Sequence, residues 1–445
     1  MIEVAPEIIV TLMFVGILVG LFLLGHPIAF VLAGLAIIFA LIGWGPEAWY
    51  LLIGRTFDVM KNNLLIAVAL FILMACFLEK GGIAEGLFKG MMYIFGPING
   101  SITLAVVVLC VVMAACTGIM GATVVSMSLM AIPVMMKHNY DKHLATGTVA
   151  AAGTLGIIIP PSIMLVLMAD QSGISVGRLF AGGIGPGVVL GTLYFGYILV
   201  RTRLNPKLGP ALSIEERAAV PVRERLRLVT VNMVPPLALI FGVLGSIWLG
   251  VATPTEASGV GAFIALVLMI IYRRFTWRKL KDAVWMATRT NCMVMAIIVG
   301  ASLFTAVFIG LGGGEVVTEL VMSVGFLGKW AVFAVMMLIV FVLGFMIDWI
   351  GIVYITFPLF LPIAAHLGFD TVWFVILMAV NLQMSFLTPP VGYALFYLKG
   401  TVPEGITLTD VYRGIIPFVI LQVIGLSIVV MFPPLATWLP SFIAK

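Results

Sequence analysis

The chain has 445 residues, of which 62% are hydrophobic and 10% charged, and its mean hydropathy of +1.23 excludes an ordinary soluble domain. Many apolar runs exceed the roughly 18 residues that cross a bilayer as a helix, so a signal peptide or a single anchor cannot account for them. The formal charge of +5 comes from basic residues in short loops, which positive-inside topology explains better than a nucleic-acid partner does.

The first departure from plain apolar spans lies at residues 117–133. This segment is short and polar in its middle, and we expect a re-entrant helical hairpin with small residues at its tip. The next apolar segment is interrupted at residues 153–162, where Pro160 and Pro161 remove two backbone donors and break the helix. Unpaired backbone at bilayer depth is tolerated beside protein or an aqueous cavity, so we expect this break at a buried site.

A polar linker follows at residues 201–228. It carries seven Lys and Arg residues, which places it on the cytoplasmic side of the membrane, and it is too short to fold around a core of its own. Beyond it, Thr253 and Glu256 flank Pro254 in the pattern of a capping box at the start of a helix. A second basic cluster at residues 273–289 is also expected in the cytoplasm.

The second half contains a second hairpin and a second broken helix. Residues 344–362 predict the hairpin, and the polar run 381–392, which includes Pro389 and Pro390, predicts the break. Asp348 lies well inside the apolar stretch of this hairpin. A carboxylate in that position is costly enough to be functional, and its alternative role is to cap the returning helix of the hairpin.

An internal duplication relates the two halves at an offset of 227 to 229 residues. The aligned pairs are Pro27 with Pro254, Gly34 with Gly261, Asn63 with Asn291, Pro133 with Pro362, Asp141 with Asp370, and Pro160-Pro161 with Pro389-Pro390. The turn at residues 137–143 is basic, whereas its partner at 365–370 has no Lys or Arg, so corresponding loops lie on opposite faces. We expect inverted repeats at residues 1–200 and 229–445, an architecture of secondary transporters that some channels share.

Several sequence motifs of ATP hydrolysis, catalysis and metal binding are absent from the chain. No Gly-x-x-x-x-Gly-Lys-Ser/Thr phosphate loop occurs, so ATP hydrolysis by that route is excluded, and an ion gradient or another subunit must supply the energy. Neither paired catalytic carboxylates nor a nucleophile with its base indicates an enzyme. The spacing of the His and Cys residues gives no transition-metal site.

Three motifs carry a resemblance to a known family. They are Ala151-Ala152-Gly153-Thr154-Leu155-Gly156 running into Ile159-Pro160-Pro161-Ser162, then Ala252-Thr253-Pro254-Thr255-Glu256-Ala257, and Asn381-Leu382-Gln383 running into Thr388-Pro389-Pro390. Essentially the whole chain resembles the large membrane subunit of the tripartite ATP-independent periplasmic (TRAP) transporters. The resemblance implies an elevator-type sodium symporter of a bacterial inner membrane that uses no ATP. It also implies a transport domain at about residues 110–170 and 338–400, with the remainder as a scaffold.

The same resemblance implies partners and sites. The partners are a small four-helix membrane subunit and a periplasmic binding protein that delivers a small carboxylate. One sodium site is implied at Thr117, Gly118, Gly121, Thr123, Gly153 and Gly156, and another at Gly344, Asp348, Gly351, Asn381, Ser385 and Thr388. The solute is implied between them, near Pro160, Pro161, Ser162, Pro389 and Pro390.

One departure from the family pattern bears on the first site. Many relatives have a serine-rich first hairpin tip, whereas this chain has Ile119 and Met120 between Thr117 and Thr123, so the side-chain ligands of that site stay open. The Gly121-Ala122-Thr123 form resembles a subgroup linked to 2-oxo acids and lactate. We expect sodium-coupled carboxylate import with a binding protein; the alternative is a self-sufficient carboxylate carrier driven by sodium or protons.

Overall fold

The structure is a computed structural model, and it describes residues 5–118, 120–389 and 392–443. These ranges fold into helices with short connections and contain no strand. Nine helices within them are long and apolar enough to cross a membrane, and α4 (Leu64–Lys80) with α5 (Ile83–Ile94), bent by 59°, makes a tenth candidate. The expected all-α, multi-pass architecture is therefore confirmed.

The helices follow the chain in two halves joined by a linker. The remaining helices of the first half are α1 (Pro6–Leu18), α2 (Ile28–Trp44), α3 (Ala48–Met60), α6 (Ser101–Thr117), α7 (Met120–Lys137), α8 (Lys142–Gly153), α9 (Ile163–Ser172) and α10 (Val176–Leu204). The linker holds α11 (Ile214–Ala218). The second half contains α12 (Val222–Trp248), α13 (Pro254–Ile271), α14 (Trp277–Gly310), α15 (Gly313–Met322), α16 (Lys329–Leu343), α17 (Trp349–His366), α18 (Thr371–Ser385), α19 (Tyr393–Lys399), α20 (Leu408–Met431) and α21 (Pro434–Thr437).

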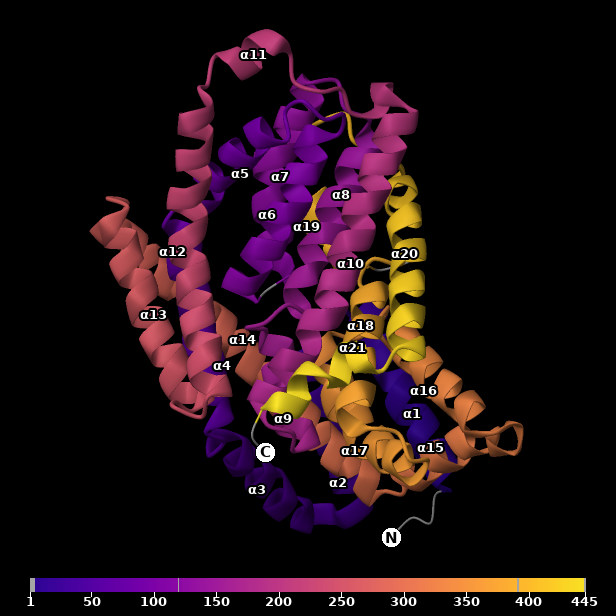
Figure 1. The fold of residues 1–445 in the computed structure, drawn as a ribbon. Coiled ribbons are helices and arrows are strands. Elements are labelled where there is room, and N and C mark those ends of the chain that lie inside the picture. Colours follow the sequence, from indigo (N-terminus) through magenta and orange to yellow (C-terminus); the bar gives the residue numbers. More distant parts are fainter. Residues whose placement is uncertain (1–4, 119, 390–391, 444–445) are drawn as a thin grey trace.

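Contacts divide most of these helices into two bundles (Figure 1). We call α1–α5 with α12–α14 the peripheral bundle, in which α14 packs along α2 and α4, and α13 packs against α4 and α12. We call α6–α10 with α16–α21 the hairpin bundle, in which α8 packs against α7 and α20, and α10 against α18 and α20. The two bundles meet where α4 contacts α6 and α9, where α14 contacts α17, where α5 contacts α6, and where α12 contacts α6 and α10.

The hairpin bundle contains two helical hairpins, but each is longer than predicted, because residues 117–133 and 344–362 hold only the tip and most of the second arm. α6 and α7 form the first and α16 and α17 the second, and Figure 1 shows α7 in the upper part of the view and α17 in the lower part. Asp141 caps α8 by accepting a hydrogen bond from Leu144 N at 2.9 Å, and Asp370 caps α18 by accepting one from Trp373 N at 2.9 Å. The two halves therefore start their broken helices with the same cap at aligned positions.

Packing buries the helices that lead to both breaks. Every residue of α8 from Leu144 to Gly153 is buried, and so is every residue of α18 from Val372 to Ser385. Both helices therefore reach their breaks through the core. The first break is itself buried apart from the half-buried Ile159, as a break at bilayer depth requires, whereas Pro389 of the second break is exposed. In the peripheral bundle, the capping box that Thr253 and Glu256 predict at the start of α13 is confirmed.

Candidate ion and solute site

The first hairpin tip packs onto the first break. α6 ends at Thr117, Gly118 has a φ of +59°, and α7 begins at Met120. A Cβ atom at Gly118 would lie 2.8 Å from the Pro161 carbonyl oxygen, so both the positive φ and the close contact require glycine here. The side chain of Thr117 and the whole of Ile119 lie outside the described residues.

The first break is an irregular segment between α8 and α9. A 3-10 turn, η3 (Thr154–Ile157), follows α8, and the chain then passes through a cis Pro160–Pro161 bond. The Ser162 hydroxyl donates to the Ile157 carbonyl oxygen at 2.6 Å and accepts a hydrogen bond from Leu165 N at 3.4 Å. One side chain therefore both closes the break and caps α9.

Four of the residues implied at the first sodium site lie close to this tip and break. Besides Gly118, a Cβ atom at Gly153 would lie 2.5 Å from the Val124 side chain, and one at Gly156 would lie 3.9 Å from the Thr123 hydroxyl oxygen. Thr123 is buried. The oxygen atoms that these contacts place here are the Pro161 carbonyl oxygen and the Thr123 hydroxyl oxygen.

The implied residue Gly121 faces a different neighbour. A Cβ atom at Gly121 would lie 3.1 Å from the ring of Tyr397 in α19, beyond the second break. The first hairpin tip therefore contacts both halves of the hairpin bundle, and Gly121 lines the space between them.

The second hairpin tip packs against the end of α18. A Cβ atom at Gly344 would lie 2.0 Å from the Ser385 hydroxyl oxygen, which is the closest contact at this tip. Asn381 Nδ2 donates to the Met337 carbonyl oxygen of α16 at 2.7 Å, so the buried amide ties α18 to the same hairpin. Gly351 lies on the side of α17 that packs against Leu32 of α2, in the peripheral bundle.

The second break begins later than the sequence predicts. The polar run from residue 381 predicts the interruption there, but α18 continues through Asn381 to Ser385 because their side chains bond to helix carbonyls and do not disturb the turn. Among the described residues, 386–389 and 392 are irregular, and the Thr388 hydroxyl donates to the Met384 carbonyl oxygen at 2.9 Å. Pro390 lies outside the described residues, and Pro389 is exposed.

Asp348 occupies the N-cap of α17. Its carboxylate accepts a hydrogen bond from Ile350 N at 3.2 Å, which is the capping role that the sequence offers as one alternative. The same side chain lines the cavity between the two hairpin tips. A carboxylate has about four acceptor positions, so capping of α17 does not exhaust those of Asp348.

A cavity of about 100 Å³ lies between the two tips and the two breaks, covered by Ile72 of α4 and Val294 of α14. The first residues of four helices line it: Met120 of α7, Ile163 of α9, Trp349 of α17 and Tyr393 of α19. Helix N-termini present backbone N–H groups and the positive end of the helix dipole. None of the described lining residues is Lys or Arg, so an anion here would depend on these N-termini, hydroxyl groups and bound cations.

A hydrogen bond joins the two breaks directly, and sequence reasoning missed it. Gln383 Nε2 donates to the Thr154 hydroxyl at 3.0 Å, across a separation of 229 residues that equals the repeat offset. The two residues occupy equivalent positions of the two halves, so the bond lies where the pseudo-symmetry axis passes. Gln383 is fully buried, and its Oε1 has no hydrogen-bond partner among the described residues. The repeat offset of 229 residues is the feature of the sequence from which this pair could have been predicted.

The structure also contains another cavity, with polar side chains in its wall, that the sequence did not predict. It measures about 320 Å³ and separates α3 and α14 from α9 and α17. Asp170 of α9 accepts hydrogen bonds from Asn62 Nδ2 at 2.6 Å, Gln171 Nε2 at 2.9 Å and the Tyr354 hydroxyl at 3.3 Å. Asn62 belongs to the peripheral bundle and Tyr354 to the hairpin bundle, so this carboxylate bridges the two.

The fold and the site define the class of protein: a polytopic membrane transporter in which two hairpins and two broken helices enclose a small central cavity. The solved YdaH transporter of Alcanivorax borkumensis shares this fold, with a TM-score of 0.60 and 13% identity over 92% of this chain and 96% of that one. MtrF of Neisseria gonorrhoeae aligns with a TM-score of 0.58 and 13% identity over 98% of this chain and 95% of that one.

The family follows from sequence comparison. The model of the tripartite ATP-independent periplasmic transporter, DctM component, matches residues 15–435. The C4-dicarboxylate TRAP transporter large permease of Vibrio cholerae is 31% identical over 98% of each chain, and that of Pseudomonas aeruginosa is 31% identical over 90% of this chain and 91% of its own. The 2,3-diketo-L-gulonate TRAP transporter large permease of Escherichia coli is 28% identical over 95% and 97%.

The chain belongs to the TRAP transporter large permease family, which confirms the resemblance. It is a multi-pass inner-membrane transport subunit and not an enzyme.

Proposed function

We propose that this subunit imports a small organic acid together with sodium ions. The observation that carries the proposal is the convergence of the N-termini of α7, α9 and α17 on one cavity without a Lys or Arg side chain. Such a site attracts a carboxylate through backbone N–H groups and helix dipoles. The relatives named for C4-dicarboxylates and for 2,3-diketo-L-gulonate carry organic anions, which supports a solute of the same class.

Charge balance gives a reason for coupling to a cation. Asp348 lines the cavity, so a solute carboxylate entering it meets a second negative charge in a small space of low dielectric. A sodium ion bound beside Asp348, Ser385 and Thr388 would relieve that repulsion. Solute binding then depends on prior or simultaneous sodium binding, which is the requirement for symport.

Movement of the hairpin bundle past the peripheral bundle would carry the site across the membrane. The tips, the breaks and most of the cavity wall belong to the hairpin bundle, whereas α4 and α14 contribute the cover. A rigid-body shift of one bundle against the other leaves the proposed ligands together while it uncovers either side. In this scheme a small four-helix subunit enlarges the peripheral bundle, and a periplasmic binding protein delivers the solute.

Uptake into proteoliposomes tests the proposal. The chain is reconstituted with its small membrane partner under an inward sodium gradient, and radiolabelled C4-dicarboxylate, lactate or a 2-oxo acid is supplied with and without the binding protein. Accumulation that needs both sodium and the binding protein supports the tripartite symporter. Accumulation without the binding protein favours the self-sufficient carrier, and passive current without accumulation contradicts both.

A further inference from the structure

The first part of the linker is attached to the hairpin bundle. Asp141 N donates to the Leu208 carbonyl oxygen at 2.9 Å, and Gly100 N donates to that of Gly209 at 2.7 Å. Leu212 N in turn donates to the carbonyl oxygen of Gly96 at 3.0 Å. These backbone bonds fix residues 208–212 to the loops that precede α6 and α8, so this part of the linker moves with the hairpin bundle.

The end of α11 is attached to the peripheral bundle. Arg225 of α12 donates through Nε to the Val220 carbonyl oxygen at 2.8 Å, and its guanidinium group also donates to the carbonyl oxygen of Arg217. Figure 1 shows α11 at one end of the molecule, in the connection between α10 and α12. The short helix therefore bridges the two bundles, with its C-terminal end held by α12.

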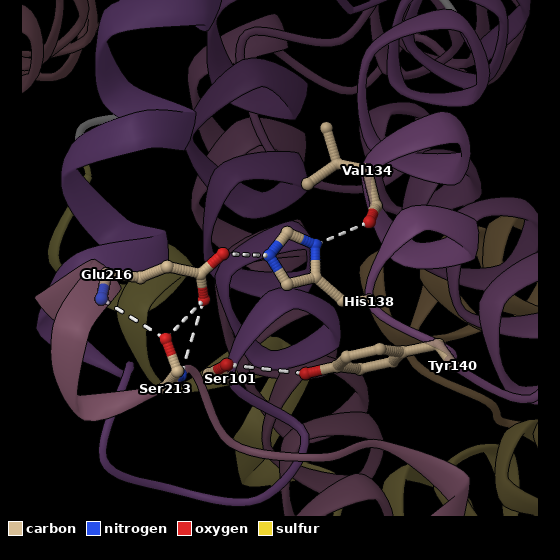
Figure 2. Close-up of polar contacts among 6 residues, drawn as sticks. All are labelled: Ser101, Val134, His138, Tyr140, Ser213 and Glu216. Atoms are coloured by element: carbon tan, nitrogen blue, oxygen red, sulfur yellow. Dashed lines mark hydrogen bonds and ion pairs between the residues drawn. The ribbon is translucent and has the colours of Figure 1, made fainter.

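A side-chain contact joins α11 to the hairpin bundle (Figure 2). His138, in the turn after α7, lies with Nε2 3.2 Å from Glu216 Oε1 of α11. Glu216 is oriented by the capping box of α11, in which it accepts from Ser213 N at 3.3 Å. The turn that carries His138 is itself fixed, because the buried Tyr140 hydroxyl bonds to the Ser101 hydroxyl at 3.3 Å. Two rigid elements thus meet through one histidine–glutamate pair.

The geometry of the imidazole selects its charged form. His138 Nδ1 donates to the Val134 carbonyl oxygen at 2.8 Å, while Nε2 faces a carboxylate oxygen (Figure 2). Both neighbours are acceptors, and a neutral imidazole has only one N–H. Only the imidazolium form donates at both nitrogens. A neutral ring that keeps its proton on Nδ1 for Val134 places a lone pair opposite the carboxylate, so the contact is strongest when both ring nitrogens carry a proton.

The surrounding charges leave Glu216 as the partner of His138. The carboxylate is ionised because, although desolvation opposes ionisation, hydrogen bonds from Ser213 and the contact with His138 lower the pKa of Glu216. Among the described residues it is the charged side chain in contact with the imidazole. The other titratable residues of this turn, the start of α8 and α11 are Lys137, Tyr140, Asp141, Lys142, His143, Glu215 and Arg217, none of which has a described ion pair with His138.

We propose that the His138–Glu216 pair is a protonation-dependent clasp that holds the hairpin bundle against the α11 bridge. The inference rests on the proposed movement of the hairpin bundle, since a clasp between the bundles has an effect only if they move. When His138 is protonated the clasp is closed and the arrangement in Figure 1 is favoured. When it is neutral the pair opens, and exchange between arrangements becomes faster. A partly exposed ion pair of this kind shifts such an equilibrium by about two- to fivefold.

Spin labels on both sides of the clasp test it without requiring transport. Lys137→Cys and Ala218→Cys are introduced with the exposed Cys292 replaced by Ala, and the label separation is measured by pulsed electron resonance at about pH 6 and pH 8. We expect the short-distance population to be about two- to fivefold larger, relative to the long one, at the lower pH. An identical distribution at both pH values overturns the proposal.

Matched variants separate the clasp from other pH effects. Glu216→Gln keeps the capping-box pattern and can pair with either form of imidazole, so the label separation should lose its pH dependence. Glu215→Gln removes the same charge from the adjacent exposed position and should retain it. A pH response that persists in Glu216→Gln contradicts the assignment of the pair.

Uptake by the same variants distinguishes failure of the clasp from failure of the transport proposal. If the native chain accumulates solute with sodium and the labels do not respond to pH, the clasp is wrong and the transporter stands. If the labels respond and no solute accumulates under any condition, the transport proposal fails and the clasp remains as a structural contact. If the labels respond to pH and the native chain also accumulates solute, uptake can be compared between the two chains. The uptake rate of Glu216→Gln divided by that of the native chain should then fall about two- to fivefold from pH 6 to pH 8.

Discussion

The two broken-helix regions share a backbone plan but differ in their side chains. At the offset of 229 residues, four polar residues of the second region correspond to apolar residues or glycine in the first. The pairs are Asp348 with Ile119, Asn381 with Ala152, Ser385 with Gly156, and Thr388 with Ile159. In the opposite direction, Thr123 of the first region corresponds to Ile352 of the second. The breaks therefore recur at aligned positions, whereas the polar side chains around them differ.

This difference predicts an asymmetric response to mutation. Side-chain oxygens can be removed by substitution, so the second region should be sensitive to polar-to-apolar changes. Backbone carbonyls cannot be removed in that way, so the first region should respond chiefly to changes that alter backbone packing.

The largest effect is expected at Gly344. A Cβ atom there would overlap Ser385, with 2.0 Å to its hydroxyl oxygen and 2.5 Å to its Cβ, and neither α18 nor the tip can shift without opening the site. Overpacking of this kind costs about 1–3 kcal/mol, so Gly344→Ala should reduce sodium-driven uptake by about tenfold or more. Uptake is measured in proteoliposomes at matched protein content.

Gly156→Ala is the matched change in the first region. Gly156 aligns with Ser385, yet a Cβ atom there meets nothing closer than 3.5 Å, the distance to Ala114 Cα. We expect uptake within about twofold of the native rate, since ordinary van der Waals contacts are formed. Equal losses in Gly344→Ala and Gly156→Ala would contradict the asymmetry.

Asp348→Asn separates the ion role from the capping role. The asparagine oxygen can still accept from Ile350 N and cap α17, so helix stability should change little. The negative charge facing the cavity is lost, and we expect the sodium concentration for half-maximal uptake to rise about tenfold, which corresponds to ~1.4 kcal/mol. Sodium titrations of uptake measure this shift.

Two control variants are compared with Asp348→Asn. Asp370→Asn makes the same chemical change at the N-cap of α18 and should leave the sodium dependence unchanged. Thr123→Ala removes the side-chain hydroxyl of the first region and should raise the half-maximal sodium concentration by only about threefold, because carbonyl ligands remain. If Asp348→Asn behaves like Asp370→Asn, Asp348 is a helix cap and the second site needs another anionic ligand.

Sequence reasoning located the hairpins and breaks because their causes are local. Paired prolines, hairpin glycines and interrupted apolar runs act within one or two turns of helix, and Thr253 caps α13 at its predicted start. The predicted start of the second break was wrong. A run of polar residues has the same sequence pattern whether its side chains face a break or bond to helix carbonyls. Asn381 and Ser385 do the latter.

Contacts between distant segments could not be predicted in the same way. The bond between Asn62 and Asp170 joins residues 108 positions apart, and the pair of His138 and Glu216 joins residues 78 apart. No local pattern fixes which helices pack together, so neither partner could be chosen from the sequence. Gln383 and Thr154 are a partial exception, since the repeat offset places them at equivalent positions.

The bond between the two breaks should have a moderate effect. Gln383→Met removes the hydrogen bond to Thr154 and also the buried Oε1 that has no described partner, so the two changes in stability partly offset each other. We expect about a threefold loss of uptake, because the two regions are no longer held in register. In a double-mutant cycle with Thr154→Val, the second substitution should add little, with a coupling of about 1 kcal/mol. Fully additive losses would show that the bond does not couple the regions.

The smallest effect is expected where the two halves differ away from the site. α13 begins with a capping box in which Thr253 Oγ1 accepts from Glu256 N at 3.2 Å, whereas α2, which starts beside the aligned Pro27, has no side-chain cap. Thr253→Ala gives α13 an uncapped start like that of α2. We expect the Tm to fall by about 1–2 °C while uptake and its sodium dependence stay native, and Glu256→Gln, which preserves the box, should change neither. A loss of uptake in Thr253→Ala would mean that the difference between the halves extends beyond the two breaks, into the bundle that covers them.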